Sequence, residues 1–282
     1  MKVLRFRKHW KVELTDEPEP QPAPGEVIVE VDAVGICGSD VHGFAGITDR
    51  RKPGVVMGHE IGGRIVAGPG SGPDTVTVFP QLGCGTCDSC TAGLEQLCDA
   101  LKIVGVAPER LGGFAERLPV PAGNVVPMPG ASPVIAALAG ELGHVVPGPT
   151  DDLGPWMASN GGPVDVAFDA VGTDESVAEA LACTRPDGAV VEIGLGVPTN
   201  SIMLQLLVGK QRSLLGSFAY SRAIFERAAC ELTEGVPGVE RLVSAIVPLE
   251  ETAARLETLA YGKDRSLRVQ VSPSGRCLPH PA

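Results

Sequence analysis

The chain has 282 residues, of which 44% are hydrophobic and 20% charged, and its formal net charge is −11. This length allows one large or two ordinary domains with a sizeable core. The acidic balance argues against nucleic acid and anionic membranes as partners. The sequence has no run of 18 apolar residues, so it predicts no membrane span.

Short strands and turns rich in glycine and proline are typical of residues 1–130. Segment 27–36 alternates apolar and polar residues, as a half-buried strand does, and it leads directly to Cys37. A further strand ends at the pair His59 and Glu60. This pattern predicts a compact, β-rich, barrel-like unit.

Four cysteines follow within one lobe, residues 84–98, at the spacing C-x2-C-x2-C-x7-C. Four thiolates can close a tetrahedral Zn²⁺ site and leave no open coordination position, so such a zinc is structural. A pair of disulfides is the alternative, but C-x2-C spacings strain a direct bridge and the chain shows no secretory context. The predicted ligands of this structural zinc are Cys84, Cys87, Cys90 and Cys98.

A second, catalytic zinc needs about three protein ligands and an open position. Cys37 and His59 are the candidate ligands, because both lie at strand ends flanked by glycine, where an ion has room to approach. Glu60 is either a further ligand or a group that supports the ligands from outside the coordination sphere. Asp40 is placed to hydrogen-bond the His59 imidazole and fix its tautomer.

Ser39 and His42 follow within one turn of Cys37, so they could pass protons to or from a zinc-bound oxygen. The alternative interpretation of this segment is a buried cysteine, a capping serine and aspartate, and surface histidines. The nearby four-cysteine lobe favours the metal site.

With four cysteines assigned to zinc, we expect the others to be unpaired. Together with a charged N-terminus that resembles no secretion signal, this predicts a cytoplasmic protein.

Buried strands alternate with helices after residue 130, and this alternation predicts parallel βαβ units. A strand, a short helix and a last strand follow over 243–271. The expected strands of the alternating part are 164–172, 189–196 and 213–220, and its expected helices are 132–143, 174–188 and 221–235.

Four segments, GICGSDVHGF, VVMGHEIGGRIV, CGTCDSC with its fourth cysteine, and GGFAE, occur in this order. Together they resemble the zinc-dependent medium-chain dehydrogenase/reductase family, and within it the alcohol, polyol and threonine dehydrogenases. The resemblance covers 1–130 and resumes at about 160–272. On the family pattern, Cys37 and His59 match the catalytic zinc ligands, Glu60 the adjacent carboxylate, and Ser39 and His42 the proton relay.

The resemblance implies an α/β protein that joins a GroES-like β-rich catalytic domain to a Rossmann-like parallel α/β domain. It also implies a homodimer, formed through the strand near 213–220. The implied segments are a GroES-like zinc-binding catalytic domain at 1–130, a truncated Rossmann-like domain at 131–242, a segment returning to the catalytic domain at 243–272, and a tail at 273–282.

The chain departs from this family between the barrel and the strand at 164–172. Only 33 residues, 131–163, lie there, whereas one βαβ unit takes roughly 30 or more. No G-x-G-x-x-G fingerprint is present in this interval. The sequence therefore predicts a shortened Rossmann-like domain that lacks the first βαβ unit, and it predicts that NAD(P) binding is unlikely. Glu141 is either the third protein ligand of the catalytic zinc or an exposed helix residue, and His144 is a weaker substitute.

Three functions follow from this pattern. The first is a non-redox zinc enzyme that uses its Zn²⁺ as a Lewis acid for elimination, hydration, cyclisation or aldol-type chemistry on a small carbonyl or hydroxyl compound. The second is an NAD(P)-dependent zinc alcohol or polyol dehydrogenase. The third is a zinc-binding remnant without catalysis. The sequence favours the first, because the metal motifs are intact while the phosphate loop is missing.

Overall fold

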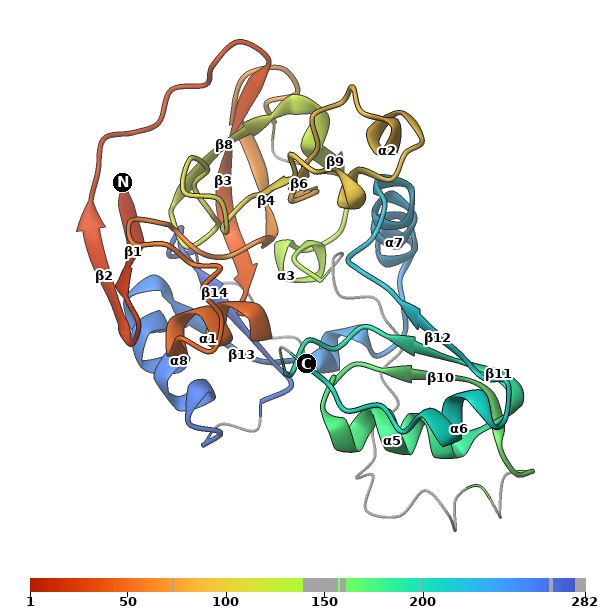
Figure 1. The fold of residues 1–282 in the computed structure, drawn as a ribbon. Coiled ribbons are helices and arrows are strands. Elements are labelled where there is room, and N and C mark those ends of the chain that lie inside the picture. Colours follow the sequence, from red (N-terminus) through yellow and green to blue (C-terminus); the bar gives the residue numbers. More distant parts are fainter. Residues whose placement is uncertain (73, 139–156, 158–160, 198, 264–265, 277–282) are drawn as a thin grey trace. The chain divides into compact units, whose positions relative to one another are not determined.

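The computed structural model describes residues 1–72, 74–138, 157, 161–197, 199–263 and 266–276. Its contacts divide the chain into two compact units (Figure 1). The first unit comprises Met1–Gly143 and Tyr220–Ala282, and the second comprises His144–Ala219. None of the described helices combines the length and the apolar character that crossing a bilayer requires.

The first unit is β-rich, as predicted, and its main sheet has the strand order β13-β14-β3-β4-β5-β9, with β8 also paired to β3. Two small antiparallel pairs, β1 with β2 and β6 with β7, complete its strands. The strands of this unit are β1 (Lys2–Lys8), β2 (Lys11–Asp16), β3 (Glu26–Gly35), β4 (Glu60–Ala67), β5 (Val76–Val78), β6 (Gln81–Leu82), β7 (Lys102–Ile103), β8 (Arg117–Pro121), β9 (Val125–Pro127), β13 (Val243–Pro248) and β14 (Arg268–Ser272).

Short helices connect these strands, and two longer helices, α7 and α8, follow near the C-terminal end of the described chain. The helices of the first unit are α1 (Gly38–Ala45), α2 (Asp88–Thr91), η1 (Glu95–Leu97), η2 (Ala122–Asn124), α3 (Pro133–Ala136), α7 (Arg222–Glu234), η3 (Val239–Leu242), η4 (Leu249–Glu251) and α8 (Thr252–Ala260).

Strand β3 is the centre of this sheet, and eight of its ten positions are buried, including Val29, Val31 and Val34. Such burial follows from its partners, because β4, β8 and β14 all pair with it. The last residues of β3 are therefore held in a fixed position, and the chain continues from there to Cys37.

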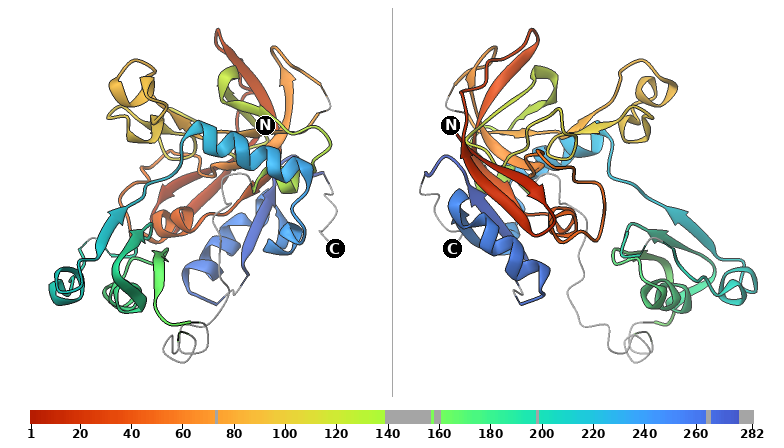
Figure 2. Two further views of the ribbon diagram at one scale, coloured as in Figure 1. Left: turned by 90° about the vertical axis from the view of Figure 1, so that its right-hand side faces the viewer. Right: turned by 60° about the vertical axis from the view of Figure 1, so that its left-hand side comes forward.

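The C-terminal part of the chain returns to this centre. Strand β14 pairs antiparallel with β3, with Val271 opposite Val34, and parallel with β13. Figure 2 shows β13 and β14, in blue, beside α8. The buried amide of Gln270 donates to the carbonyl oxygen of Val134 at 2.9 Å, which joins β14 to α3. The site at the end of β3 is thus bordered by residues from both ends of the sequence.

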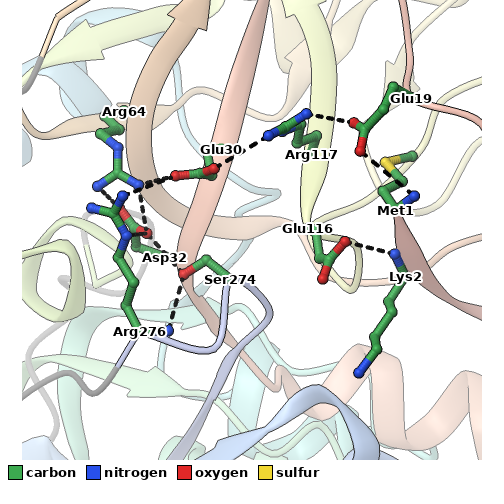
Figure 3. A network of polar contacts seen from close by, with 10 residues as sticks. All are labelled: Met1, Lys2, Glu19, Glu30, Asp32, Arg64, Glu116, Arg117, Ser274 and Arg276. Atoms are coloured by element: carbon green, nitrogen blue, oxygen red, sulfur yellow. Dashed lines mark hydrogen bonds and ion pairs between the residues drawn. The ribbon is translucent and has the colours of Figure 1, made fainter.

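A network of ion pairs holds the turn after β14 against β3 and β4 (Figure 3). Arg64 on β4 pairs with Glu30 and lies 3.2 Å from Asp32, both on β3. Ser274 donates to Asp32 at 2.9 Å, and Arg276 lies 3.5 Å from Glu30. Burial raises the pKa of Asp32, and the hydrogen bond from Ser274 and the charge of Arg276 oppose that rise.

The hairpin of β1 and β2 provides a pH-dependent prediction. Glu17 accepts from Arg5 at 2.6 Å, and the bond to Arg5 lowers the pKa of Glu17 from its usual 4.5. A lowered folded-state pKa contributes stability above the unfolded value, and that contribution is lost as the pH falls through the folded value. We expect Glu17→Gln to reduce the free energy of unfolding by about 1 kcal/mol at pH 7.

Urea unfolding of both proteins from neutral pH down to about pH 3 measures this difference. Because any effect of acid on zinc is common to both proteins, their difference isolates Glu17. It should shrink once the pH falls below the usual pKa of a glutamate, about 4.5. A difference that stays constant over this range would contradict the assignment.

The second unit contains a parallel three-stranded sheet in the order β10-β11-β12. Of the described part of this unit, helices α5 and α6 lie on one side of the sheet (Figure 1), where they enclose a small core around Val177, Leu181 and Val190. The elements of this unit are β10 (Val164–Asp169), α5 (Asp174–Cys183), β11 (Thr184–Glu192), α6 (Leu204–Val208) and β12 (Ser213–Gly216).

Helix α5 begins at its predicted residue but ends at Cys183, shorter than the predicted 174–188. Pro186 explains the difference, because a proline disfavours the helical conformation of the residue before it, and β11 already begins at Thr184. The predicted α/β class, a β-rich unit with a parallel α/β unit, is confirmed. The predicted absence of the first βαβ unit and the predicted domain boundaries at 130, 242 and 272 remain predictions.

Candidate functional site

The four cysteines of the predicted zinc lobe lie together, with their sulfur atoms within 4.8 Å of one another. Cys84 Sγ and Cys90 Sγ are 4.0 Å apart. Tetrahedral Zn–S bonds of about 2.3 Å place sulfurs roughly 3.8 Å apart, whereas a disulfide requires about 2.05 Å. All four are free thiols. The geometry therefore fits a metal and not the disulfide alternative.

Local sequence explains how this lobe forms. Gly83 leaves room for a sulfur, because a Cβ there would lie 2.7 Å from Cys90 Sγ. The thiolate of Cys84 accepts from the Thr86 hydroxyl and from the backbone amides of Thr86 and Cys87, and these bonds lower its pKa to about 5. A sulfur that is already stabilised as a thiolate is a better metal ligand.

A second group of possible ligands lies where β3 ends and β4 begins. One ligand atom each from Cys37, His59 and Glu60 lies within 4.8 Å of the other two. Cys37 follows β3 and caps α1, while Glu60 is the first residue of β4, which pairs with β3. The antiparallel pairing thus brings Cys37 together with residues 22 and 23 positions further along the chain. These three side chains form the metal cluster.

The carboxylate of Glu60 is buried, and besides belonging to the metal cluster it accepts hydrogen bonds from an arginine. Arg268 on β14 donates to both of its oxygens, at 3.0 and 3.2 Å. Gly35, opposite Glu60 on β3, makes room for it, because a Cβ there would fall 1.9 Å from Glu60 Oε2. Burial raises the pKa of Glu60, and the Arg268 charge opposes that rise.

Asp40 and Ser39 both face His59. Asp40 Oδ2 lies 3.6 Å from His59 Nδ1, and Ser39 Oγ lies 3.5 Å from His59 Nε2. His42 occupies the next turn of α1, on the same side as Ser39 and half-buried. No hydrogen bond or ion pair of the described residues joins the His42 ring to the metal cluster. Glu141 and His144 lie outside the described residues.

The chemistry of these side chains fits a divalent zinc ion. Burial, followed by the charges of Glu60 and Asp40, raises the pKa of the Cys37 thiol to about 12. Without a cation, such a thiol stays protonated at neutral pH. A metal reverses this preference, because its charge deprotonates a coordinating thiol. One sulfur, one imidazole nitrogen and one carboxylate oxygen form a set that zinc accepts in catalytic sites.

Two charged residues of this site had not been identified from the sequence. Arg268 is far from Glu60 along the chain, and nothing local to either residue indicates that β14 brings them together. Arg51 is almost fully buried and pairs with Asp40 Oδ1 at 2.9 Å. It lies in a polar stretch, DRRKPG, that reads as an exposed turn. Its burial depends on a pocket that only the folded chain forms.

Two family models match this chain. The alcohol dehydrogenase GroES-like domain matches residues 23–130, and the zinc-binding dehydrogenase domain matches residues 131–234. Together the matches cover most of the sequence and both structural units.

Two of the relatives are named as dehydrogenases. L-threonine 3-dehydrogenase of Pyrococcus abyssi is 37% identical over 153 residues, which are 51% of this chain and 43% of that enzyme. The chain thus spans less than half the length of this relative. L-idonate 5-dehydrogenase (NAD(P)(+)) of Escherichia coli K12 is 27% identical over 315 positions, covering 86% of this chain and 91% of the enzyme. That alignment is longer than the present chain, so part of the relative has no counterpart in it.

Solved structures show the same fold. An alcohol dehydrogenase of Escherichia coli CFT073, solved with NADH, superposes with a TM-score of 0.83 at 21% identity. The superposition covers 97% of this chain and 99% of that one.

These relatives correct two predictions. The prediction of a non-redox zinc enzyme is wrong, because the relatives are dehydrogenases and support the oxidoreductase alternative. The prediction that NAD(P) is unlikely is also wrong, since one relative is named for NAD(P)⁺ and a structural neighbour holds NADH. The cofactor prediction was wrong because it took the absence of the G-x-G-x-x-G fingerprint as the absence of cofactor binding. Backbone amides in other turns also bind phosphate groups.

Proposed function

Because the chain belongs to the zinc-dependent medium-chain dehydrogenase family, we propose that it is a zinc-dependent oxidoreductase that interconverts a small hydroxyl compound and its carbonyl with NAD(P). The observation that carries this proposal is the metal cluster of Cys37, His59 and Glu60 at the junction of β3 and β4. We assign the four-cysteine lobe to a structural zinc. Glu141 remains a proposed further ligand of the catalytic zinc.

In this proposal Cys37, His59 and Glu60 hold the catalytic zinc. A zinc with an open position supplies a Lewis acid that polarises a hydroxyl or carbonyl oxygen. Ser39 Oγ lies 3.5 Å from His59 Nε2, so its hydroxyl would accept the proton of a substrate hydroxyl bound beside His59 and pass on its own. His42, one turn further along α1, would then receive that proton and release it to water.

The second unit fits one part of a nicotinamide nucleotide. Glu192 ends β11 directly opposite Asp169, and burial together with Asp169 raises the pKa of Glu192. Carboxyl groups at the carboxyl end of a parallel sheet accept hydrogen bonds from ribose hydroxyls and from a carboxamide. The first turn of α5 carries Asp174 and Glu175, which repel phosphate. The N-terminus of α5 therefore does not fit the pyrophosphate.

Two further features support the proposed cellular location and oligomeric state. The described cysteines are free thiols, which supports a reducing, cytoplasmic environment. Strand β12 pairs only with β11 in the part of the chain that the structure describes, so its other edge is available for a partner strand. We propose a homodimer through this edge and a small-molecule substrate.

Titration of the zinc-loaded protein with NADH and NADPH, followed by nicotinamide fluorescence, tests the proposal. We expect one of the two to bind with a Kd between about 1 μM and 1 mM, a range typical of enzyme ligands. Glu192→Gln should weaken this binding, whereas Glu179→Gln, on the exposed side of α5, should leave it unchanged.

Oxidation of L-idonate and L-threonine, the substrates for which the two relatives above are named, should then depend on zinc. Absence of both cofactor binding and turnover with the whole panel would refute the proposed function.

A further inference from the structure

We propose that Arg51 is a positioning residue that orients Asp40 and Ser39, and thereby sets the His59 imidazole for binding the catalytic metal. This inference rests on the proposed zinc site.

Arg51 is buried and donates hydrogen bonds to two side chains of α1. Its side chain is 2% exposed, and that of Asp40 is fully buried. Nη2 of Arg51 donates to Asp40 Oδ1 at 2.9 Å and to Ser39 Oγ at 3.3 Å. A planar guanidinium holds two acceptors in one fixed geometry, which a flexible ammonium does less well. Arg51 thus links the two α1 residues that face His59.

The other oxygen of Asp40 faces the proposed ligands. Asp40 Oδ2 accepts from the backbone amide of Cys37 at 3.3 Å and lies 3.6 Å from His59 Nδ1. Arg51 on Oδ1 and the Cys37 amide on Oδ2 together hold the carboxylate with Oδ2 toward His59, whose buried Nδ1 has no hydrogen-bond partner among the described residues. A carboxylate at Nδ1 leaves Nε2 as the atom for the metal, and such partners orient ligating histidines.

Stability alone does not account for an arginine at this position. A buried ion pair is often no better than apolar residues of the same volume. Arg51 Nε is buried and has no hydrogen-bond partner among the described residues, which adds a cost. Helix α1 also needs a glycine where the arginine crosses it, because a Cβ on Gly43 would lie 2.3 Å from Arg51 Cγ. The benefit of this arginine therefore lies in the metal site that it supports.

Metal binding by Arg51→Met tests this role directly. We expect the affinity of the metal cluster for Zn²⁺, measured by chelator competition, to fall about 10- to 100-fold, as after other losses of groups that orient metal ligands. The four-cysteine lobe should keep its zinc. With Co²⁺ in the cluster, the visible spectrum of Arg51→Met should shift. Arg51→Lys should recover part of both signals, because an ammonium can still reach Asp40.

Two further variants separate positioning from stability. Arg64→Met breaks the ion pairs with Glu30 and Asp32, none of which belongs to the metal cluster, so it should lower stability and leave the cobalt spectrum unchanged. The double variant Arg51→Met with Asp40→Asn removes both buried charges and provides a folded protein if Arg51→Met alone unfolds. It should bind zinc as weakly as Arg51→Met.

The outcomes are distinguishable. Wild-type affinity and an unchanged cobalt spectrum in Arg51→Met, or in the double variant if only that one folds, would overturn the role of Arg51. Tighter binding, as expected if the arginine charge merely repels the metal, would overturn it as well. A wild-type protein that binds no metal at the cluster would instead refute the proposed function.

Discussion

Replacement of Cys37 by serine will lower the zinc content from about two ions per chain to about one and reduce alcohol oxidation by roughly 10³-fold. Cys37 supplies the only sulfur of the metal cluster. A serine hydroxyl remains protonated at neutral pH and is a poor ligand for zinc. The loss of Lewis-acid stabilisation is worth several kcal/mol, and each 1.36 kcal/mol is a factor of ten in rate.

Metal analysis and initial rates on the same sample measure both effects. Cys230→Ser is the matched control, because this cysteine is exposed on α7, donates to Glu234 and belongs to neither metal site. It should retain full zinc content and activity. Two zinc ions in Cys37→Ser would mean that the metal cluster does not require this thiolate, and the assignment of the catalytic site would fail.

Replacement of Cys98 by serine will release the other zinc and unfold the lobe around it. This lobe has little apolar burial of its own, since Leu94 and Leu97 are 41% and 54% exposed. Cys98 is its buried ligand, and its sulfur accepts from the Cys84 amide at 3.4 Å. Structural zinc contributes folding energy directly, so we expect a loss of at least about 3 kcal/mol.

Limited proteolysis with a glutamate-specific protease reports the state of this lobe. Glu95 lies within it and should become a cleavage site in Cys98→Ser, while zinc content falls to about one ion per chain. The metal cluster should still bind Co²⁺, because no ligand of that cluster comes from residues 84–98. A protected Glu95 together with full zinc content would show that the four sulfurs are not a structural metal site.

The sequence was informative where a site is local. Cys84, Cys87 and Cys90 are separated by two residues each, so their clustering requires only a few turns of the chain. Cys37 and His59 were also identified, because each lies at the end of a predicted strand beside glycines. The alternation of strands and helices after residue 130 gave β10, α5 and β11 in the correct order.

The remaining parts of the site depend on contacts that no short segment encodes. Arg268 meets Glu60 only because β14 pairs with β3, and the charge of either residue alone is typical of a surface. Gly43 leaves the room beside α1 that the buried Arg51 side chain occupies. The cofactor prediction failed for a related reason. A fingerprint is one local solution to phosphate binding, and its absence does not exclude others.

The pairing of β14 with β3 also determines when this protein can finish folding. Arg268 follows Ile36, its hydrogen-bond partner, by 232 residues, so the ribosome adds the last strand roughly 10 to 50 seconds after the central one. During that time a nascent chain can already close its four-cysteine lobe. Glu60, however, lacks its cation, and the edge of β3 that β14 later covers stays open. We therefore expect metal loading at Cys37 and His59 to be completed only after β14 has been made.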